Sequence, residues 1–179
     1  RRLLVSAWNV GDIEDAVLPP CHYSFQCYTQ LIPYTKLIDR LIALHGISYD
    51  NIPTDFEKLR ELANSLNEPI RYLSLSFKMR SADVGLGVPY NISSYGILLM
   101  MLAKITNTEP YELIGHFGDA HIYVNQIEGL TTQINREPYV LPFAELSNRI
   151  VSDISEYSID DFELIGYNSH PAIYLPLSN

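Results

Sequence analysis

Residues 73–106, LSLSFKMRSADVGLGVPYNISSYGILLMMLAKIT, join an alternating segment to a loop with two glycines and a long apolar segment. Apolar and polar residues alternate over Ser74–Arg80, which predicts a strand with one apolar face. Pro89 suits the first turn of a helix that we expect to extend to Thr106. Because Ile97–Ala103 is apolar on every side, we expect this helix to be buried at the centre of the fold.

Strands and helices are also predicted on the N-terminal side of this stretch. Arg2–Trp8 and Cys21–Thr29 have strand patterns, and Tyr34–His45 has apolar residues at helical spacing with Gly46 as a stop signal. A capping box at Thr54-Asp55-Phe56-Glu57 begins a second helix. The residues from about 31 to 68 therefore predict an αα-hairpin inserted between two strands. In Cys21–Thr29, alternation assigns one face to Cys21, Tyr23, Phe25 and Cys27, and the other to His22, Ser24, Gln26 and Tyr28.

The C-terminal part is predicted to contain short elements. We expect strands near Glu112–Phe117 and His121–Val124, a helix ending at about Ile134, and a strand over Asp161–Tyr167. No repeat, low-complexity segment or linker divides the chain. The sequence therefore predicts an α+β fold, in one domain, with a central buried helix and an inserted helical hairpin.

Composition excludes several classes of function. The chain of 179 residues has 12 Lys+Arg against 21 Asp+Glu, a net charge of −9, which argues against a general binder of nucleic acid or anionic membranes. The longest apolar run, Tyr95–Ala103, is shorter than the roughly 20 residues that cross a bilayer. Two cysteines make no disulfide framework, so we expect a reducing compartment, the cytoplasm, or the host cytoplasm for a viral protein.

Three features could carry chemistry. Cys21 begins a strand directly after two prolines, beside His22, although a lone cysteine is more often a small buried hydrophobe. Arg80–Asn91 combines a cation, glycines and a helix start, as an anion site does, but it could equally be an ordinary strand-to-helix loop. His121 and Tyr123 would point the same way from a strand, where a packed core pair is more common. Cys27 is assigned to packing, and no cysteine or histidine pair has the spacing of a zinc site.

These segments, taken together and in order, resemble the thymidylate synthase family. The matching stretches are Leu4–Asn9, Leu18–His22, Arg80–Tyr95, Gly118–Asn125, Arg136–Pro138, Asp161–Phe162, Gly166–Tyr167 and His170–Pro171. The resemblance covers nearly the whole chain except the inserted hairpin, where the family usually has a short turn. It implies a catalytic domain with a mixed β-sheet, without the family's N-terminal region.

The resemblance also implies a reaction and a site. Cys21 would add to C6 of dUMP, which activates C5 to accept a one-carbon unit from 5,10-methylenetetrahydrofolate, the cosubstrate. Asn91 would read the uracil edge, and the other residues implied in the dUMP site are Arg80, Ser81, Asp83, His22, Gln26, His121 and Tyr123. The folate would contact Asp83, Leu86, Gly87 and Tyr90. Arg1 and Arg2 would reach the phosphate of a partner subunit, which implies a homodimer.

Departures from the family pattern leave two alternatives open. Tyr90 stands where phenylalanine is usual, Gln126 stands where histidine is usual, and the end Leu177-Ser178-Asn179 replaces an apolar tail that folds over the folate. A less closed site would admit water and give hydroxymethyl-dUMP instead of dTMP. The other alternative is a catalytically silent half that binds a partner chain.

Overall fold

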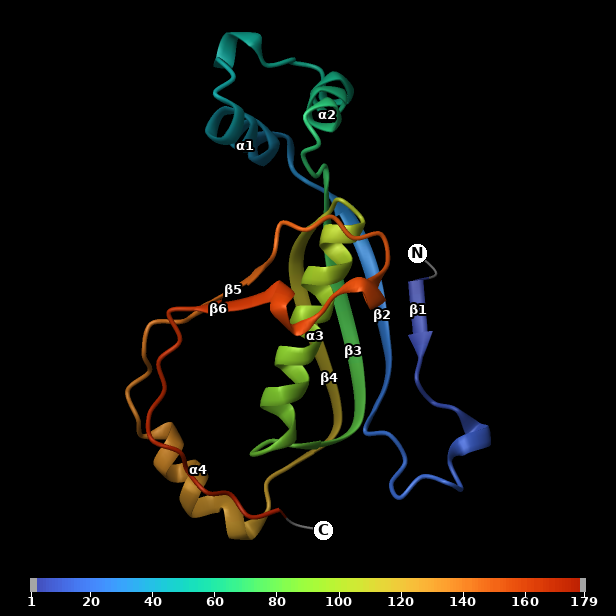
Figure 1. The fold of residues 1–179 in the computed structure, drawn as a ribbon, viewed down its shortest axis with the longest axis vertical. Coiled ribbons are helices and arrows are strands. Elements are labelled where there is room, and N and C mark those ends of the chain that lie inside the picture. The colour runs from blue at the N-terminus through green and yellow to red at the C-terminus, as the bar shows by residue number, and fades with distance from the viewer. Residues whose placement is uncertain (1–2, 178–179) are drawn as a thin grey trace.

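The structure, a computed structural model, describes residues 3–177. Four strands form one sheet in the order β1 (Leu3–Ser6), β2 (His22–Leu31), β3 (Arg71–Asp83), β4 (Glu109–His121). The β1–β2 and β2–β3 pairs are antiparallel, and β3 and β4 are parallel, so the sheet is mixed. Helix α3 (Gly87–Ile105) connects the two parallel strands and packs on one face of the sheet (Figure 1). The predicted α+β fold is confirmed.

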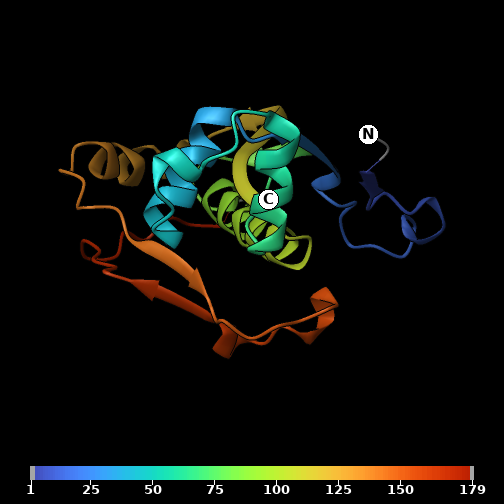
Figure 2. The ribbon, with the colours of Figure 1, turned by 90° about the horizontal axis from the view of Figure 1, so that it is seen from above.

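Helix α3 lies between two layers of strands. Tyr95, Leu99 and Ala103 recur every four residues and are buried against the apolar side chains of the sheet, while the other side chains of Ile97–Leu102 are half-buried. On the far side of the helix lies a two-stranded antiparallel ribbon of β5 (Phe143–Leu146) and β6 (Phe162–Ile165), seen most clearly from above (Figure 2). The helix begins two residues before Pro89, because Gly87 and Val88 already form its first turn.

The inserted hairpin consists of α1 (Tyr34–His45) and α2 (Phe56–Ser65), which project beyond the end of the sheet (Figure 1). Gly46 ends α1 in the left-handed conformation, with φ of 63°, as its position predicts. The helix cap of α2 is Asp55 and not Thr54, since the Asp55 carboxylate accepts from the Lys58 N–H at 3.0 Å. A hydrogen bond of 3.0 Å from Ile32 N to Ile70 O closes the base of the hairpin.

The C-terminal half differs from prediction in two places. Strand β4 contains the first expected strand and continues through the turn-like Gly118-Asp119 to His121, because parallel pairing with β3 extends to the Asp83–His121 pair. The second expected strand, His121–Val124, is wrong, since no strand continues beyond His121. Strand β5 was not predicted, since Phe143–Leu146 follows a proline-containing segment without clear alternation. Helix α4 (Ile127–Ile134) agrees with prediction. Short 3₁₀ turns complete the chain: η1 (Val10–Asp12), η2 (Tyr49–Asn51), η3 (Val124–Gln126), η4 (Ile154–Glu156) and η5 (Ile159–Asp161).

A β-bulge changes the predicted faces of β2. The register with β3 shifts between His22 and Ser24, so strict alternation does not apply to the start of the strand. Phe25 and Cys27 pack on the α3 side, as predicted. His22 contacts α3 as well, whereas Tyr23 lines a pocket with Lys78 on the opposite face. The predicted grouping of Tyr23 with Cys21 is therefore wrong. No helix of residues 3–177 has the length and apolarity that a membrane crossing requires.

Candidate active site

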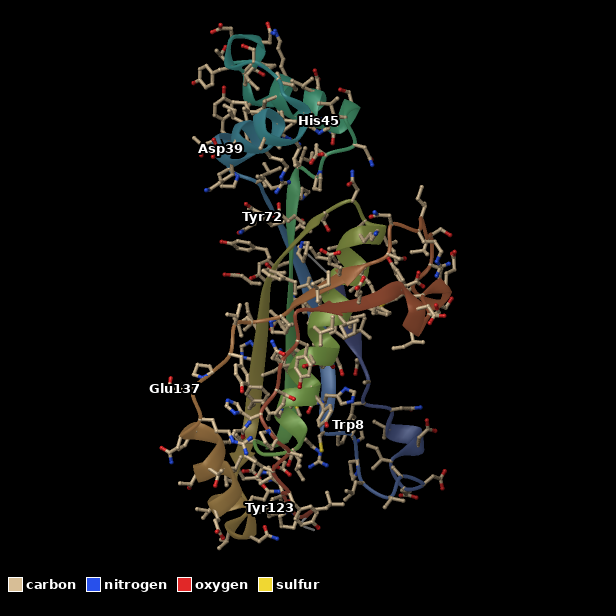
Figure 3. All side chains as sticks on the ribbon, turned by 60° about the vertical axis from the view of Figure 1, so that its left-hand side comes forward. Trp8, Asp39, His45, Tyr72, Tyr123 and Glu137 are labelled. Carbon is tan, nitrogen blue, oxygen red and sulfur yellow. The ribbon has the colours of Figure 1, made fainter. Side chains whose placement is uncertain are left out.

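Most of the predicted site residues gather at the end of the sheet away from the hairpin. There β2 begins, β3 and β4 end, and α3 starts (Figure 1). Figure 3 shows Trp8 and Tyr123 at this end, while Asp39 and His45 lie at the other. The long β3 and β4 thus separate the candidate site from the insertion.

Cys21 is tied to Arg80 through the backbone and through the residues that precede it. The Arg80 N–H donates to the Cys21 carbonyl at 2.8 Å, and the Arg80 guanidinium donates to the carbonyls of Pro19 at 2.7 Å and Pro20 at 3.2 Å. Cys21 is half-buried against the α3 core. By contrast Cys27 is buried, and burial raises the pKa of its thiol, so this cysteine stays protonated and unreactive.

Gly118 of strand β4 allows a close approach to the backbone of Arg80. A Cβ atom at position 118 would lie 2.9 Å from the Arg80 carbonyl oxygen, which is closer than side chains approach backbone. Glycine therefore lets β4 pack directly on the strand that holds Arg80.

The bulge turns His22 towards α3, where Tyr95 meets it. The Nδ1 atom of His22 lies 3.2 Å from the Tyr95 hydroxyl, and the two rings meet edge to face with centroids 6.0 Å apart. Sequence reasoning missed Tyr95, although it lies four residues after Asn91, one turn along the same helix. That spacing was the signal that could have found it.

The loop between β3 and α3 is organised by Asp83. Its Oδ1 atom accepts hydrogen bonds from Gly85 N at 2.9 Å and Leu86 N at 3.1 Å. The Oδ1 atom of Asn91 lies beside position 87, at 3.6 Å from an ideal Cβ there. Asp83, Gly87 and Asn91 are therefore brought together, as expected for residues around one ligand.

His121 and Tyr123 also lie together. Their rings meet edge to face at 5.0 Å, and His121 Nδ1 lies 3.6 Å from an Asp119 carboxylate oxygen. In the sheet His121 pairs with Asp83, and Asp119 pairs with Ser81. The two rings are half-buried, not core residues, which makes them accessible to a ligand.

Gln26, which is predicted in the site, is not united with this cluster. Gln26 pairs with Ser76 on the face of the sheet that lacks α3, here called the polar face and defined by Gln26, Tyr28, Ser76, Lys78 and His116. Arg1 and Arg2 lie outside the described residues. Tyr90 is 76% exposed and, with Leu86, lines a pocket of about 570 Å³ next to Leu175 of the C-terminal segment.

A cationic pocket of about 710 Å³ opens on the polar face beside Arg80. It is lined by Trp8, Tyr23, Lys78, Met79, Arg80, His116, Phe117 and Gly118. Lys78 and His116 were not predicted, because a lysine and a histidine on a half-exposed strand give no signal until the sheet pairs them. In residues 3–177 no group of three or more His, Cys, Asp or Glu residues could hold a metal ion.

Comparisons with known proteins agree with this arrangement. A family model described as thymidylate synthase matches residues 1–179. The chain is 36% identical over 178 residues to a thymidylate synthase of Agaricus bisporus, covering 99% of this chain and 49% of that protein. It is 38% identical over 173 residues to a thymidylate synthase of Malacoplasma penetrans (strain HF-2), covering 97% of this chain and 46% of that protein. The chain thus spans about half the length of the curated relatives it matches.

Proposed function

The chain belongs to the thymidylate synthase family, and from this premise we propose that it acts in one-carbon transfer from 5,10-methylenetetrahydrofolate to C5 of dUMP, with dTMP as product. The observation that carries the proposal is the connection of Arg80 to Cys21 at the end of the sheet. The guanidinium of Arg80 is held by the carbonyls of Pro19 and Pro20, so a cation lies next to the segment that leads into the proposed nucleophile.

The nucleophile and the base-reading group have distinct tasks. Addition of the Cys21 thiolate to C6 places negative charge on the uracil ring, at C5 and O4. The Asn91 amide can donate to O4 and accept from N3–H, which stabilises that charge and selects uracil over cytosine. The position of Asn91 in the first turns of α3, beside Asp83 and Gly87, supports this assignment.

The phosphate and the sugar would bind to different parts of the sheet end. Arg80 and Ser81 are the proposed phosphate ligands, and Arg80 also lines, with Lys78, the cationic pocket on the polar face. In a chain of net charge −9, such a local positive site is what a dianionic phosphate requires. His121 and Tyr123 would hold the deoxyribose hydroxyl, which agrees with their adjacent, half-buried rings.

The pocket beside the C-terminal segment is the proposed folate site. Exposed Tyr90 and half-buried Leu86 and Leu175 offer apolar and aromatic surface for a flat ring system, while Asp83 and Gly87 lie at the adjoining helix start. When bound, 5,10-methylenetetrahydrofolate supplies the one-carbon unit and, for a methyl product, the hydride. Asp83 keeps the loop that carries Leu86 in place through its two backbone hydrogen bonds.

The decisive experiment for the proposed function is product analysis. The protein is incubated with dUMP and 5,10-methylenetetrahydrofolate, and the mass of the nucleotide product is measured by mass spectrometry. A mass gain of one methyl group in place of hydrogen supports dTMP synthesis. A hydroxymethyl product would identify the related hydroxymethylase, which the 87% exposed Tyr174 and 81% exposed Leu177 of the C-terminal segment favour. No change in dUMP contradicts both.

We further propose a homodimer in which Arg1 and Arg2 reach the phosphate site of a second copy. Replacing both arginines with alanine should weaken dUMP binding much more than binding of the nucleoside, which has no phosphate. Mixing this double variant with Cys21→Ser should restore part of the activity, because one site then combines intact arginines with an intact cysteine. No restored activity after confirmed subunit exchange would contradict the shared site.

A second candidate function is a half that binds a partner chain without turnover. The observation that favours it is the exposure of Leu3, Leu4 and Val5 on β1, beside an apolar groove of about 420 Å³ that extends to Leu102. Turnover by the 179-residue chain alone would exclude this function. Nucleotide binding and association with another chain, without turnover, would support it.

A further inference from the structure

Tyr95 is a buried phenol that faces a site residue from inside the core. Its side chain is 8% exposed, and its ring stacks on Phe77 with centroids 4.3 Å apart and planes within 9°. Phe25 meets the same ring edge to face at 6.1 Å. These contacts fix the tyrosine ring, so the direction of its hydroxyl is set by the packing of the sheet and α3.

One direction of the hydrogen bond between Tyr95 and His22 satisfies the buried phenol. Within residues 3–177, His22 Nδ1 at 3.2 Å is the hydrogen-bond partner found for the Tyr95 hydroxyl. A buried hydroxyl needs an acceptor for its proton, and the unprotonated Nδ1 supplies one. Burial also raises the pKa of Tyr95, which keeps the phenol protonated. The direction that satisfies the buried phenol has Tyr95 as the donor and His22 Nδ1 as the acceptor.

We propose that Tyr95 is a positioning residue that holds His22 as the Nε2–H tautomer, so that the imidazole presents one N–H donor beside Cys21. The inference rests on the proposed function, in which His22 is a polar group around the pyrimidine of dUMP. His22 itself is exposed, so its contact with Tyr95 is the main restraint on its ring. The β-bulge between His22 and Ser24 turns this residue towards α3, where the phenol lies.

Tyr95→Phe tests the proposal with the ring packing retained. The matched control is Tyr28→Phe, which removes a phenol hydrogen bond of 2.8 Å to Glu112 on the polar face, away from His22. The protein is labelled with ¹⁵N-histidine, and the His22 signals are assigned by their loss in His22→Gln. We expect a protonated Nε2 and a hydrogen-bonded, unprotonated Nδ1 in the unaltered protein. In Tyr95→Phe both shifts should move towards those of free histidine, whereas Tyr28→Phe should leave them unchanged.

Turnover provides the second measurement. In Tyr95→Phe we expect kcat to fall about tenfold, the effect of one lost hydrogen bond, with KM for dUMP changed less than about twofold. A proton on Nδ1 in the unaltered protein, or unchanged His22 shifts in Tyr95→Phe, overturns the proposal. So does an unchanged kcat when the shifts do move. If the unaltered protein has no turnover, the proposed function fails, and the nitrogen shifts alone decide whether Tyr95 sets the tautomer.

Discussion

The sheet with α3 and the inserted hairpin are two regions with separate cores. In the first, Leu75, Phe77 and Leu99 belong to one buried cluster, and in the second, Leu37 and Leu41 belong to another. Polar contacts connect the two regions at the end of the sheet: Arg40 pairs with Glu109, and Asn107 donates to Asn67 at 3.3 Å.

The two regions differ in what their cores support. Around the first core lie Cys21, Arg80, Asn91 and His121, whose chemistry the sequence indicates. In the hairpin, the contacts of His45 with Glu68 and of Arg60 with Glu57, each at 2.8 Å, join residues of the insertion itself, and Arg40 reaches Glu109 of the sheet. Good packing therefore does not identify a functional region. What distinguishes the first region is a set of polar groups at the point where four elements end or begin.

Of the substitutions compared between the two regions, Cys21→Ser should have the largest effect on turnover. Turnover of dUMP should fall by at least about a thousandfold, because serine lacks the thiolate, while nucleotide binding stays largely intact. With 5-fluoro-dUMP and the folate the reaction stops at a covalent adduct, because the fluorine at C5 cannot leave as a proton does. Peptide mapping of the unaltered protein should find this adduct on Cys21. An adduct on Cys27 would contradict the assignment.

Asn91→Asp should have the next largest effect, on the choice of base. A carboxylate cannot donate to O4 of uracil but can accept from the amine of cytosine, so turnover of dUMP should fall about a hundredfold and that of dCMP should rise. The matched change in the hairpin, Asn64→Asp, should leave the preference unchanged. Steady-state kinetics with both nucleotides measure this. Full preference for dUMP in Asn91→Asp would show that Asn91 does not read the base.

Leu41→Ala should lower stability without changing turnover, the reverse of the substitutions at the site. Leu41 is fully buried in the hairpin core, so its truncation should lower the free energy of unfolding of the hairpin by about 2–5 kcal/mol. Leu44→Ala on the same helix is the control: Leu44 is 67% exposed, and the loss should be below about 0.5 kcal/mol. Hydrogen exchange of α1 and α2 measures stability, and kinetics measure turnover. A large fall in kcat for Leu41→Ala would show that the insertion is coupled to the site.

The smallest expected effect is a loss of stability at low pH that is confined to the β5–β6 ribbon next to α3. Asp161, 7% exposed at its side chain, accepts from Ser147 at 2.6 Å and from two Arg149 nitrogens, and these bonds hold the pKa of its carboxyl well below the usual range. A lowered folded-state pKa gives stability that is present above the unfolded value of about 4 and is lost as the pH falls below it.

Hydrogen exchange between pH 7 and pH 3 tests this. Protection in β5 and β6 should decline with acid, while α1 and α2 lose less. Asp161→Asn should reduce the pH dependence of the ribbon, whereas Asp160→Asn, an exposed neighbour, should not. An equal decline in the hairpin would contradict a local origin.

Local signals in the sequence were sufficient for most elements. The alternation in Ser74–Arg80, the apolar run of α3 and the glycine stop at Gly46 each depend on neighbours within a few residues. Propensity and periodicity act at that range, so these predictions are confirmed. The same reasoning divided β4 at Gly118, because no local signal reports that β3 lies alongside to supply partners.

The order of motifs in the sequence determined the family and thereby the list of candidate residues. Only the tertiary structure decided how those residues are arranged. It bulged β2 so that His22 meets Tyr95, brought Lys78 and His116 together next to Arg80, and put Gln26 on the polar face. Each of these depends on strand register and on contacts between residues far apart in the chain. A one-residue shift of register exchanges the two faces of a strand, which is why composition and spacing could not foresee them.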